Sequence, residues 1–70
     1  MPYASTDDLP PAVREHIADE RGRRLFVHVF NNAWERGAGE EAAFRQAWGA
    51  LKHAGWSKGG DGLWRRDQPK

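Results

Sequence analysis

ERGRRLFVHVFNNAWER, residues 20–36, is the stretch of sequence that decides the fold. On a helical wheel its apolar residues form one broad arc, wider than the seam of a coiled coil. The members of this arc are Leu25, Phe26, Val29, Phe30, Ala33 and Trp34. Asp19 can cap the start of the helix, and Gly37 suits the position after its end. The pattern predicts a central helix with several neighbours.

A further helix is predicted over residues 40–54, after the short connection Gly37-Ala38-Gly39. Glu40 and Glu41 suit the positive end of its dipole, and Gly55 ends it. The apolar stripe of this helix consists of Phe44, Ala47, Trp48 and Leu51.

A short helix is predicted before the central one, over residues 11–17. Asp7 or Asp8 can accept hydrogen bonds from free backbone N–H groups there, and proline suits a first helical turn. Val13 and Ile17 are four residues apart, so they share one face of this helix.

The C-terminal part changes character and predicts a β-hairpin, with residues 56–58 and 63–66 as strands. Between them, residues 59–62 read Gly-Gly-Asp-Gly, which permits positive φ wherever the turn needs it. Pairing of Lys58 with Gly62 would place Trp56 and Trp64 opposite each other. A lone hairpin is marginal in water, so we expect it to dock its tryptophans on the helices.

Composition predicts one small domain over residues 1–70, with residues 68–70 as a frayed tail. The chain has 70 residues, a net charge of +1 and no cysteine, so packing of its aromatic residues must provide stability. We expect all four tryptophans to lie largely inside. The predicted core consists of Tyr3, Phe26, Phe30, Trp34, Phe44, Trp48 and Leu51.

The sequence also predicts a cytoplasmic location, because it lacks cysteine, a signal peptide and a bilayer-length apolar stretch. We therefore expect no membrane insertion, and a monomer.

Taken in order, these features resemble the ChaB family over nearly the whole chain. The matching residues are Pro2-Tyr3, Asp8-Leu9-Pro10, Val13, Ile17, Phe30-Asn31-x-Ala33-Trp34-Glu35, Ala47-Trp48-x-x-x-Lys52, Trp56-x-Lys58 and the Gly-Asp-Gly turn before Trp64. The sequence departs from the family pattern in a shorter connection between the two long helices. It also has Ala18 in place of a common proline, and Trp56 in place of a more usual tyrosine.

The resemblance implies an α+β fold, which we expect to be a small three-helix orthogonal bundle with a C-terminal β-hairpin. It leaves open whether an N-terminal strand at Pro2-Tyr3 joins that hairpin. It also implies regulation of a cation/proton antiporter, a role attached to the family by genetic association. No catalytic or binding residues can be carried over from it.

Nothing in the sequence predicts catalysis, a metal site or a cofactor. Ser5 and Ser57 have no accompanying His–carboxylate arrangement, and the three histidines fall on different elements without ligand spacing. The run Gly37-x-Gly39-x-x-Ala42 resembles a dinucleotide fingerprint, but it follows a predicted helix and not a strand.

Two candidate binding surfaces remain. Residues 1–44 hold five Arg and eight Asp or Glu, whereas residues 45–70 hold six Lys or Arg and two Asp. The basic residues of the C-terminal part could meet nucleic acid or an acidic partner, with Trp56 or Trp64 available for base stacking. This candidate surface consists of Arg45, Lys52, Lys58, Arg65 and Arg66.

The other candidate surface is the polar face of the central helix, which could meet a protein partner. It consists of His28, Asn31, Asn32 and Glu35. Asn31 could instead bond backbone groups locally. We expect a non-catalytic regulatory protein that binds a protein partner linked to cation/proton antiport, an antiporter or its regulator. The alternative is an accessory module that binds nucleic acid through its basic surface.

Overall fold

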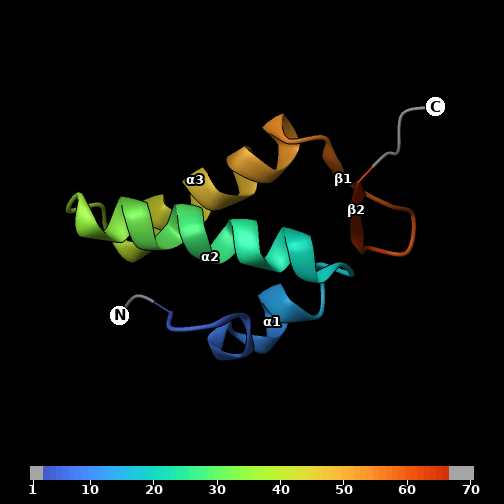
Figure 1. Cartoon of the computed structure of the whole chain (residues 1–70). Coiled ribbons are helices and arrows are strands. Elements are labelled where there is room, and N and C mark those ends of the chain that lie inside the picture. The colour runs from blue at the N-terminus through green and yellow to red at the C-terminus, as the bar shows by residue number, and fades with distance from the viewer. Residues whose placement is uncertain (1–2, 67–70) are drawn as a thin grey trace.

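A computed structural model describes residues 3–66 of the chain. The elements in order are a 3-10 turn η1 (Thr6–Asp8), α1 (Pro11–Arg14), α2 (Glu20–Glu35), α3 (Glu40–His53), β1 (Trp56–Lys58) and β2 (Trp64–Arg66). Figure 1 shows the long helices α2 and α3 lying against each other, with the hairpin beyond the end of α3. The predicted α+β class, with three helices and a C-terminal hairpin, is confirmed.

The ends of α2 follow from local capping. The Asp19 side chain accepts a hydrogen bond from the Arg21 backbone N–H at 2.9 Å, as expected of an N-cap. At the other end Gly37 adopts φ 95°, the Gly37 N–H donates to the Trp34 carbonyl, and the Ala38 N–H donates to that of Ala33. This pair of bonds is a Schellman motif, so the short connection turns the chain sharply into α3.

The core lies where α2 and α3 meet, and aromatic contacts dominate it. The Phe26 ring is 4.9 Å from Trp48 in an edge-on arrangement, and the Phe30 ring is 4.8 Å from Phe44. The fully buried hydrophobic residues are Leu9, Val13, Ile17, Phe26, Phe30, Ala33, Ala43, Ala47, Leu51 and Trp56.

One of the four tryptophans is fully buried, and the other three are partly buried and pack against the core. Trp56 is 5 % exposed, whereas Trp34, Trp48 and Trp64 have intermediate exposure. Tyr3 and Phe44, also predicted for the core, are half-buried as well. Ala43 and Ala47 of α3 are fully buried, whereas Phe44 and Trp48 on the same helix remain partly exposed.

The hairpin pairs in a different register from the expected one. Trp56 lies opposite Arg66 and Lys58 lies opposite Trp64, so the two tryptophans are not cross-strand partners. The Gly59 N–H donates to the Leu63 carbonyl at 2.8 Å and thereby closes the turn. Asp61 Oδ1 accepts from the Leu63 N–H at 3.1 Å, an Asx-type bond that fixes the loop around residues 60–62.

A third segment pairs with the hairpin, but it is the segment around Ile17 and not an N-terminal strand at Pro2-Tyr3. Ile17 forms a parallel bridge with Trp64: the Trp64 N–H donates to the His16 carbonyl, and the Ala18 N–H donates to the Trp64 carbonyl. These bonds use the backbone that would have continued α1, so the helix ends at Arg14 and not at Ile17. Tyr3 forms no strand, and the expected positions Pro2 and 68–70 lie outside the described residues.

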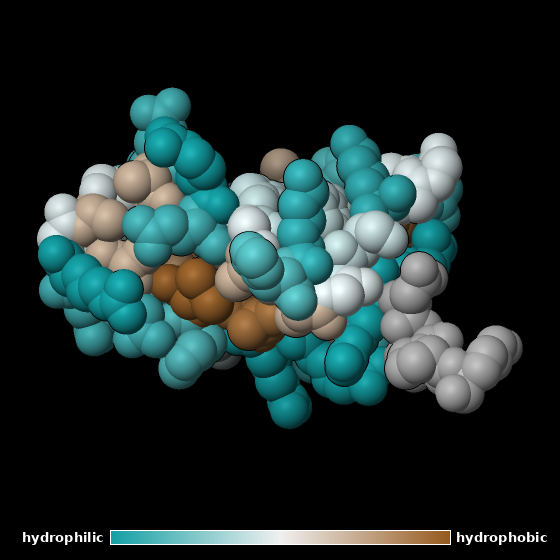
Figure 2. Space-filling model, turned by 90° about the horizontal axis from the view of Figure 1, so that it is seen from above, coloured by the Kyte–Doolittle hydropathy of each residue, from teal (hydrophilic) through white to brown (hydrophobic). Residues whose placement is uncertain are grey.

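The outer surface is mostly hydrophilic. In the view from above, a narrow hydrophobic strip crosses the middle of the molecule between charged and polar side chains (Figure 2). Among residues 3–66, no helix has both the length and the apolar character needed to span a bilayer.

Candidate functional site

Two tryptophans from distant parts of the chain meet at the surface. Trp48 lies in α3 and Trp64 in β2, and their ring centroids are 5.1 Å apart with 33° between the planes. The edge-on contact with Phe26 holds Trp48 from the core side. Both indoles remain half-buried, so they present aromatic surface to solvent from a rigid base.

These two indoles line a shallow groove of about 420 Å³ between α1 and the hairpin. Val13 is buried beneath it, while His16 and Lys58 are exposed at its rim. The bridge between Ile17 and Trp64 fixes the spacing of the two walls, because it joins the end of α1 directly to β2. The arrangement suits a bound apolar side chain.

Three basic residues of the predicted surface are neighbours of the indoles, one across the hairpin and two along α3. Lys58 shares a face of the hairpin with its cross-strand partner Trp64. Arg45 and Lys52 lie three residues before and four residues after Trp48, so they flank it on the surface of α3. Within the described range, residues 3–66, none of the three forms an ion pair.

The other two residues of the predicted basic surface lie elsewhere. Arg65 projects from the hairpin face opposite Lys58 and binds Asp61 through two hydrogen bonds, of 3.0 and 2.8 Å. The Arg65 guanidinium lowers the pKa of the Asp61 carboxyl to about 2, so that charge is already matched. Arg66 lies beside Gly55, at the end of the hairpin away from Lys58.

A second hollow, of about 400 Å³, lies between the start of α2 and the hairpin. Arg65 and Arg66 line it together with Asp19 and Arg21, which bind each other at 2.8 Å. Hydrogen bonds from Arg21 lower the pKa of Asp19. Asp19 and Arg21 are therefore paired within this hollow and Arg65 is paired with Asp61, whereas Arg66 forms no ion pair within residues 3–66.

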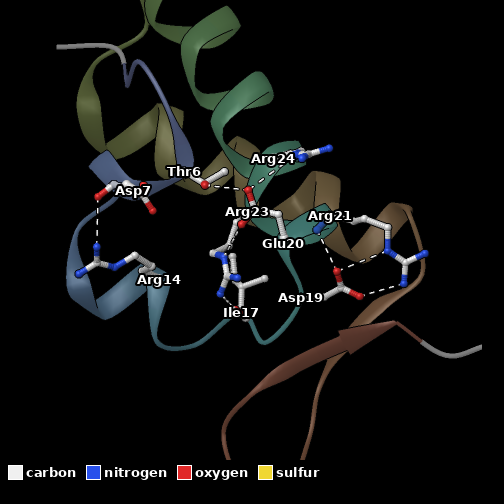
Figure 3. A network of polar contacts seen from close by, with 9 residues as sticks. All are labelled: Thr6, Asp7, Arg14, Ile17, Asp19, Glu20, Arg21, Arg23 and Arg24. Atoms are coloured by element: carbon white, nitrogen blue, oxygen red, sulfur yellow. Dashed lines mark hydrogen bonds and ion pairs between the residues drawn. The ribbon is translucent and has the colours of Figure 1, made fainter.

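The polar network beside this hollow fastens the N-terminal segment to α2 (Figure 3). Thr6 donates a hydrogen bond to Glu20 at 2.9 Å, which is the main cause of the lowered pKa of that carboxyl. Arg23 binds Glu20 at 3.3 Å and donates to the Ile17 carbonyl at 2.8 Å. The charged residues between positions 19 and 24 therefore have a structural role, because they pair with each other and with neighbouring backbone groups.

The predicted protein-partner face of α2 is only partly available. The Asn31 amide bonds both backbone groups of Tyr3, at 2.8 Å each, so it holds the N-terminal segment in place. His28 and Asn32 are exposed and contact each other at 3.2 Å, and Glu35 is exposed near the end of the helix.

The structure does not bring potential metal ligands together in the part of the chain it describes. His16 follows α1, whereas His28 lies in α2 and His53 in α3. Within residues 3–66, no three His, Asp or Glu side chains are grouped as a metal ion would require.

Sequence reasoning missed the contribution of Trp48, Val13 and His16 to the groove. It assigned Trp48 to the core because apolar residues recur along α3. The usable signal was its position on the shoulder of that stripe, between Arg45 and Lys52 on the same side of the helix. Nothing local to α1 pointed to Val13 and His16, because only the bridge to Trp64 brings them there.

Comparisons with known proteins agree on one family. A family model described as ChaB matches residues 9–67 of the chain. Relatives named "Putative cation transport regulator ChaB" occur in Escherichia coli strain K12 and Shigella flexneri, each 32 % identical over 76 residues. These alignments cover 94 % of this chain and 97 % of each relative. No solved structure matches the chain significantly.

Proposed function

This chain belongs to the ChaB family, and from that premise we propose that it regulates cation transport by binding a protein partner, without catalysing a reaction. The observation that carries the proposal is the similarity to proteins named as cation transport regulators, which extends over nearly the full length of both chains. A name that applies to the whole relative is therefore relevant to the whole of this chain.

The partner we propose is a cation/proton antiporter or a protein that controls one. The described surface supports binding more than chemistry, because its two hollows are shallow and open. We further propose that residues 1–70 act as one domain, as a cytoplasmic monomer that meets the transporter from the cytoplasmic side.

Ion exchange in membrane vesicles from the source organism tests this proposal. Inside-out vesicles are prepared from cells that lack the chain, and cation/proton exchange is followed with a pH-sensitive dye. Purified full-length chain, added at micromolar concentration, is expected to change the initial exchange rate for at least one of Na⁺, K⁺ and Ca²⁺. An unchanged rate for all three cations would contradict a role in transport regulation.

Nucleic-acid binding stays as a second candidate because one observation favours it. Adjacent indoles flanked by cations form the kind of platform on which single-stranded bases stack. Titration with single- and double-stranded oligonucleotides at low and high salt tests it, since such binding weakens steeply with salt. Three cations around the groove would give a salt slope of only about 2 for a single strand.

A further inference from the structure

The tryptophan groove, defined by Trp48, Trp64, Val13 and His16 with Lys58 at its rim, combines two features that are unusual on a small domain. Large apolar side chains are normally the ones a domain of 70 residues most needs to bury. Here Trp56 is buried, yet Trp48 and Trp64 lie side by side and are only partly buried. Their exposed surface is available for a contact that the chain itself does not make among residues 3–66.

The charges around the groove are the second feature. Three acidic residues, Asp19, Glu20 and Asp61, form ion pairs with arginines of their own neighbourhood. Arg45, Lys52 and Lys58 form none within residues 3–66. Along the chain, Glu41 lies four residues before Arg45 and forms no ion pair within residues 3–66, and Asp61, three residues after Lys58, is already paired with Arg65. Lys58 is therefore an unmatched cation at the rim of the groove, and Arg45 and Lys52 flank Trp48 without an ion pair in that range.

We propose that this groove is the docking site for an acidic protein segment that carries an exposed apolar side chain. The apolar side chain lies against Trp48 and Trp64, and neighbouring carboxylates reach Arg45, Lys52 and Lys58. This arrangement joins an aromatic anchor site to a charged rim. In protein interfaces, buried aromatic contacts provide most of the affinity, and charges at the rim mainly speed association and select the partner. The inference rests on the proposed function, because it names the surface through which that partner binds.

A protein segment fits these observations better than a nucleic acid does. The groove is backed by Val13 and Ala12, which suit an aliphatic or aromatic side chain and give no hydrogen bonds from their side chains to a base edge. Among residues 3–66, Lys58 lines the groove and Arg45 and Lys52 flank Trp48 on α3, whereas Arg65 is already paired with Asp61. A backbone of successive phosphates would find no continuous basic track here.

Nuclear magnetic resonance of the full-length, ¹⁵N-labelled chain provides the test, because two of its four indole N–H signals, those of Trp48 and Trp64, report on the groove and the other two report on other places. The probes are 12-residue synthetic peptides of Asp and Glu with Leu, Phe or Trp at the centre. Three further probes are the same acidic peptide with Ser at the centre, a Lys peptide with Phe, and a 12-nucleotide oligothymidine. We expect the acidic peptides with an apolar centre to shift the signals of Trp48 and Trp64 more than those of Trp34 and Trp56.

The variant Lys52→Glu combined with Lys58→Glu probes the rim without touching the core, because both side chains are exposed. It is expected to bind the acidic peptide about tenfold more weakly, since each exposed ion pair contributes roughly 1.5- to 5-fold. Arg36→Glu is the matched control. Like Lys52→Glu, this substitution replaces a cation at the C-terminal end of a helix, but that end of α2 lies far from the hairpin (Figure 1). The Arg36→Glu variant should bind the acidic peptide within about twofold of wild type.

Several outcomes would overturn the inference. They are an absence of binding by every acidic peptide, equal binding by the Ser-centred peptide, or unchanged affinity of the double variant. Tighter binding of oligothymidine than of any peptide would replace the inference by the nucleic-acid reading. Salt dependence does not separate these cases, because both kinds of probe are anionic.

The vesicle assay separates failure of this inference from failure of the proposed function. If the wild-type chain and the double variant change cation exchange equally, the chain regulates transport through another surface. If the wild-type chain changes nothing, the regulatory role fails, whatever the peptides do. Reduced regulation by the double variant, with Arg36→Glu unaffected, would support both.

Discussion

The side-chain amide of Asn31 pairs with both backbone groups of Tyr3, 28 residues earlier in the chain. The Tyr3 N–H donates to Asn31 Oδ1, and Asn31 Nδ2 donates to the Tyr3 carbonyl, each at 2.8 Å. The side-chain amide thus provides the donor and the acceptor that a neighbouring β-strand would offer to the backbone of Tyr3. It also brings the Tyr3 ring to 4.8 Å from Phe30 at the edge of the core.

Asn31→Asp is therefore expected to destabilise the protein. Aspartate keeps an acceptor for the Tyr3 N–H, but its second oxygen then faces the Tyr3 carbonyl with no proton between them. A partly buried unmet acceptor of this kind costs about 1–3 kcal/mol. Urea unfolding followed by circular dichroism measures the loss. Asn32→Asp, at an exposed position, should stay within about 0.5 kcal/mol of wild type, and an equal loss for both would show that the pairing with Tyr3 contributes nothing.

Gly22 in α2 lies against both Ile17 and the ring of Trp56. A Cβ at this position would lie 2.8 Å from Ile17 Cγ2 and 3.0 Å from the Trp56 ring. Gly22→Ala is thus expected to lower the free energy of unfolding by about 1–3 kcal/mol through overpacking, in spite of the better helix propensity of alanine.

Gly49 in α3 provides the matched control, because a Cβ there meets nothing within 4 Å. Gly49→Ala should raise stability by up to about 1 kcal/mol. The two substitutions are chemically identical and are expected to have opposite signs. Stabilisation of both variants would show that the start of α2 does not pack closely on Trp56.

The elements predicted correctly are those specified by neighbouring residues. Both long helices begin and end within one residue of expectation, because Asp19, Gly37 and Gly55 act through their own backbone and that of the adjacent turn. The hairpin was predictable for the same reason, since its strands flank a loop rich in glycine.

The features that could not be predicted depend on contacts between distant segments. Periodicity places Trp48 on the apolar side of α3, but how much of the indole stays exposed depends on its contacts with Phe26 of α2 and Trp64 of β2. The bridge between Ile17 and Trp64 ends α1 early and builds one wall of the groove, and no local pattern specifies it. The split of the basic surface, in contrast, follows from the alternation of side chains along β2, which places Arg65 on the face opposite Trp64 and Lys58 in the expected register as well as in the observed one.

The pairing of Asp61 with Arg65 predicts how the hairpin responds to acid. The pKa of Asp61 falls from its ordinary value of 3.8 to about 2 in the folded chain, chiefly through the Arg65 guanidinium. A group whose pKa is lowered by folding stabilises the folded state above its unfolded pKa. That contribution is lost as the pH falls through the folded value, so the relevant window lies between about pH 4 and pH 2.

Asp61→Asn should remove this part of the acid response. The difference in unfolding free energy between wild type and variant is expected to be largest near pH 5 and to shrink toward pH 2. For Arg65→Gln, the difference in unfolding free energy from wild type should shrink toward pH 2 in the same way. The double variant should lose little more unfolding free energy than either single variant. Additive effects in this double-mutant cycle, measured by urea unfolding across the pH range, would contradict the pairing.

Burial, and not the size of the ring, is expected to decide which aromatic residue stabilises the fold most. Phe26 is 0 % exposed and contacts Phe30, Phe44 and Trp48. Phe26→Ala should cost about 3–5 kcal/mol, because it leaves a cavity that α2 and α3 cannot close. The free energy of unfolding of a domain of this size is only about 4–10 kcal/mol, so the variant should lose a large part of its stability.

Trp34→Ala removes a larger ring, but that ring is partly buried and, among the aromatic residues in the range 3–66, stacks on Phe30 alone. It should cost less than half as much, and a greater loss for Trp34 than for Phe26 in thermal unfolding would mean that the core is not centred on α2 and α3 as described.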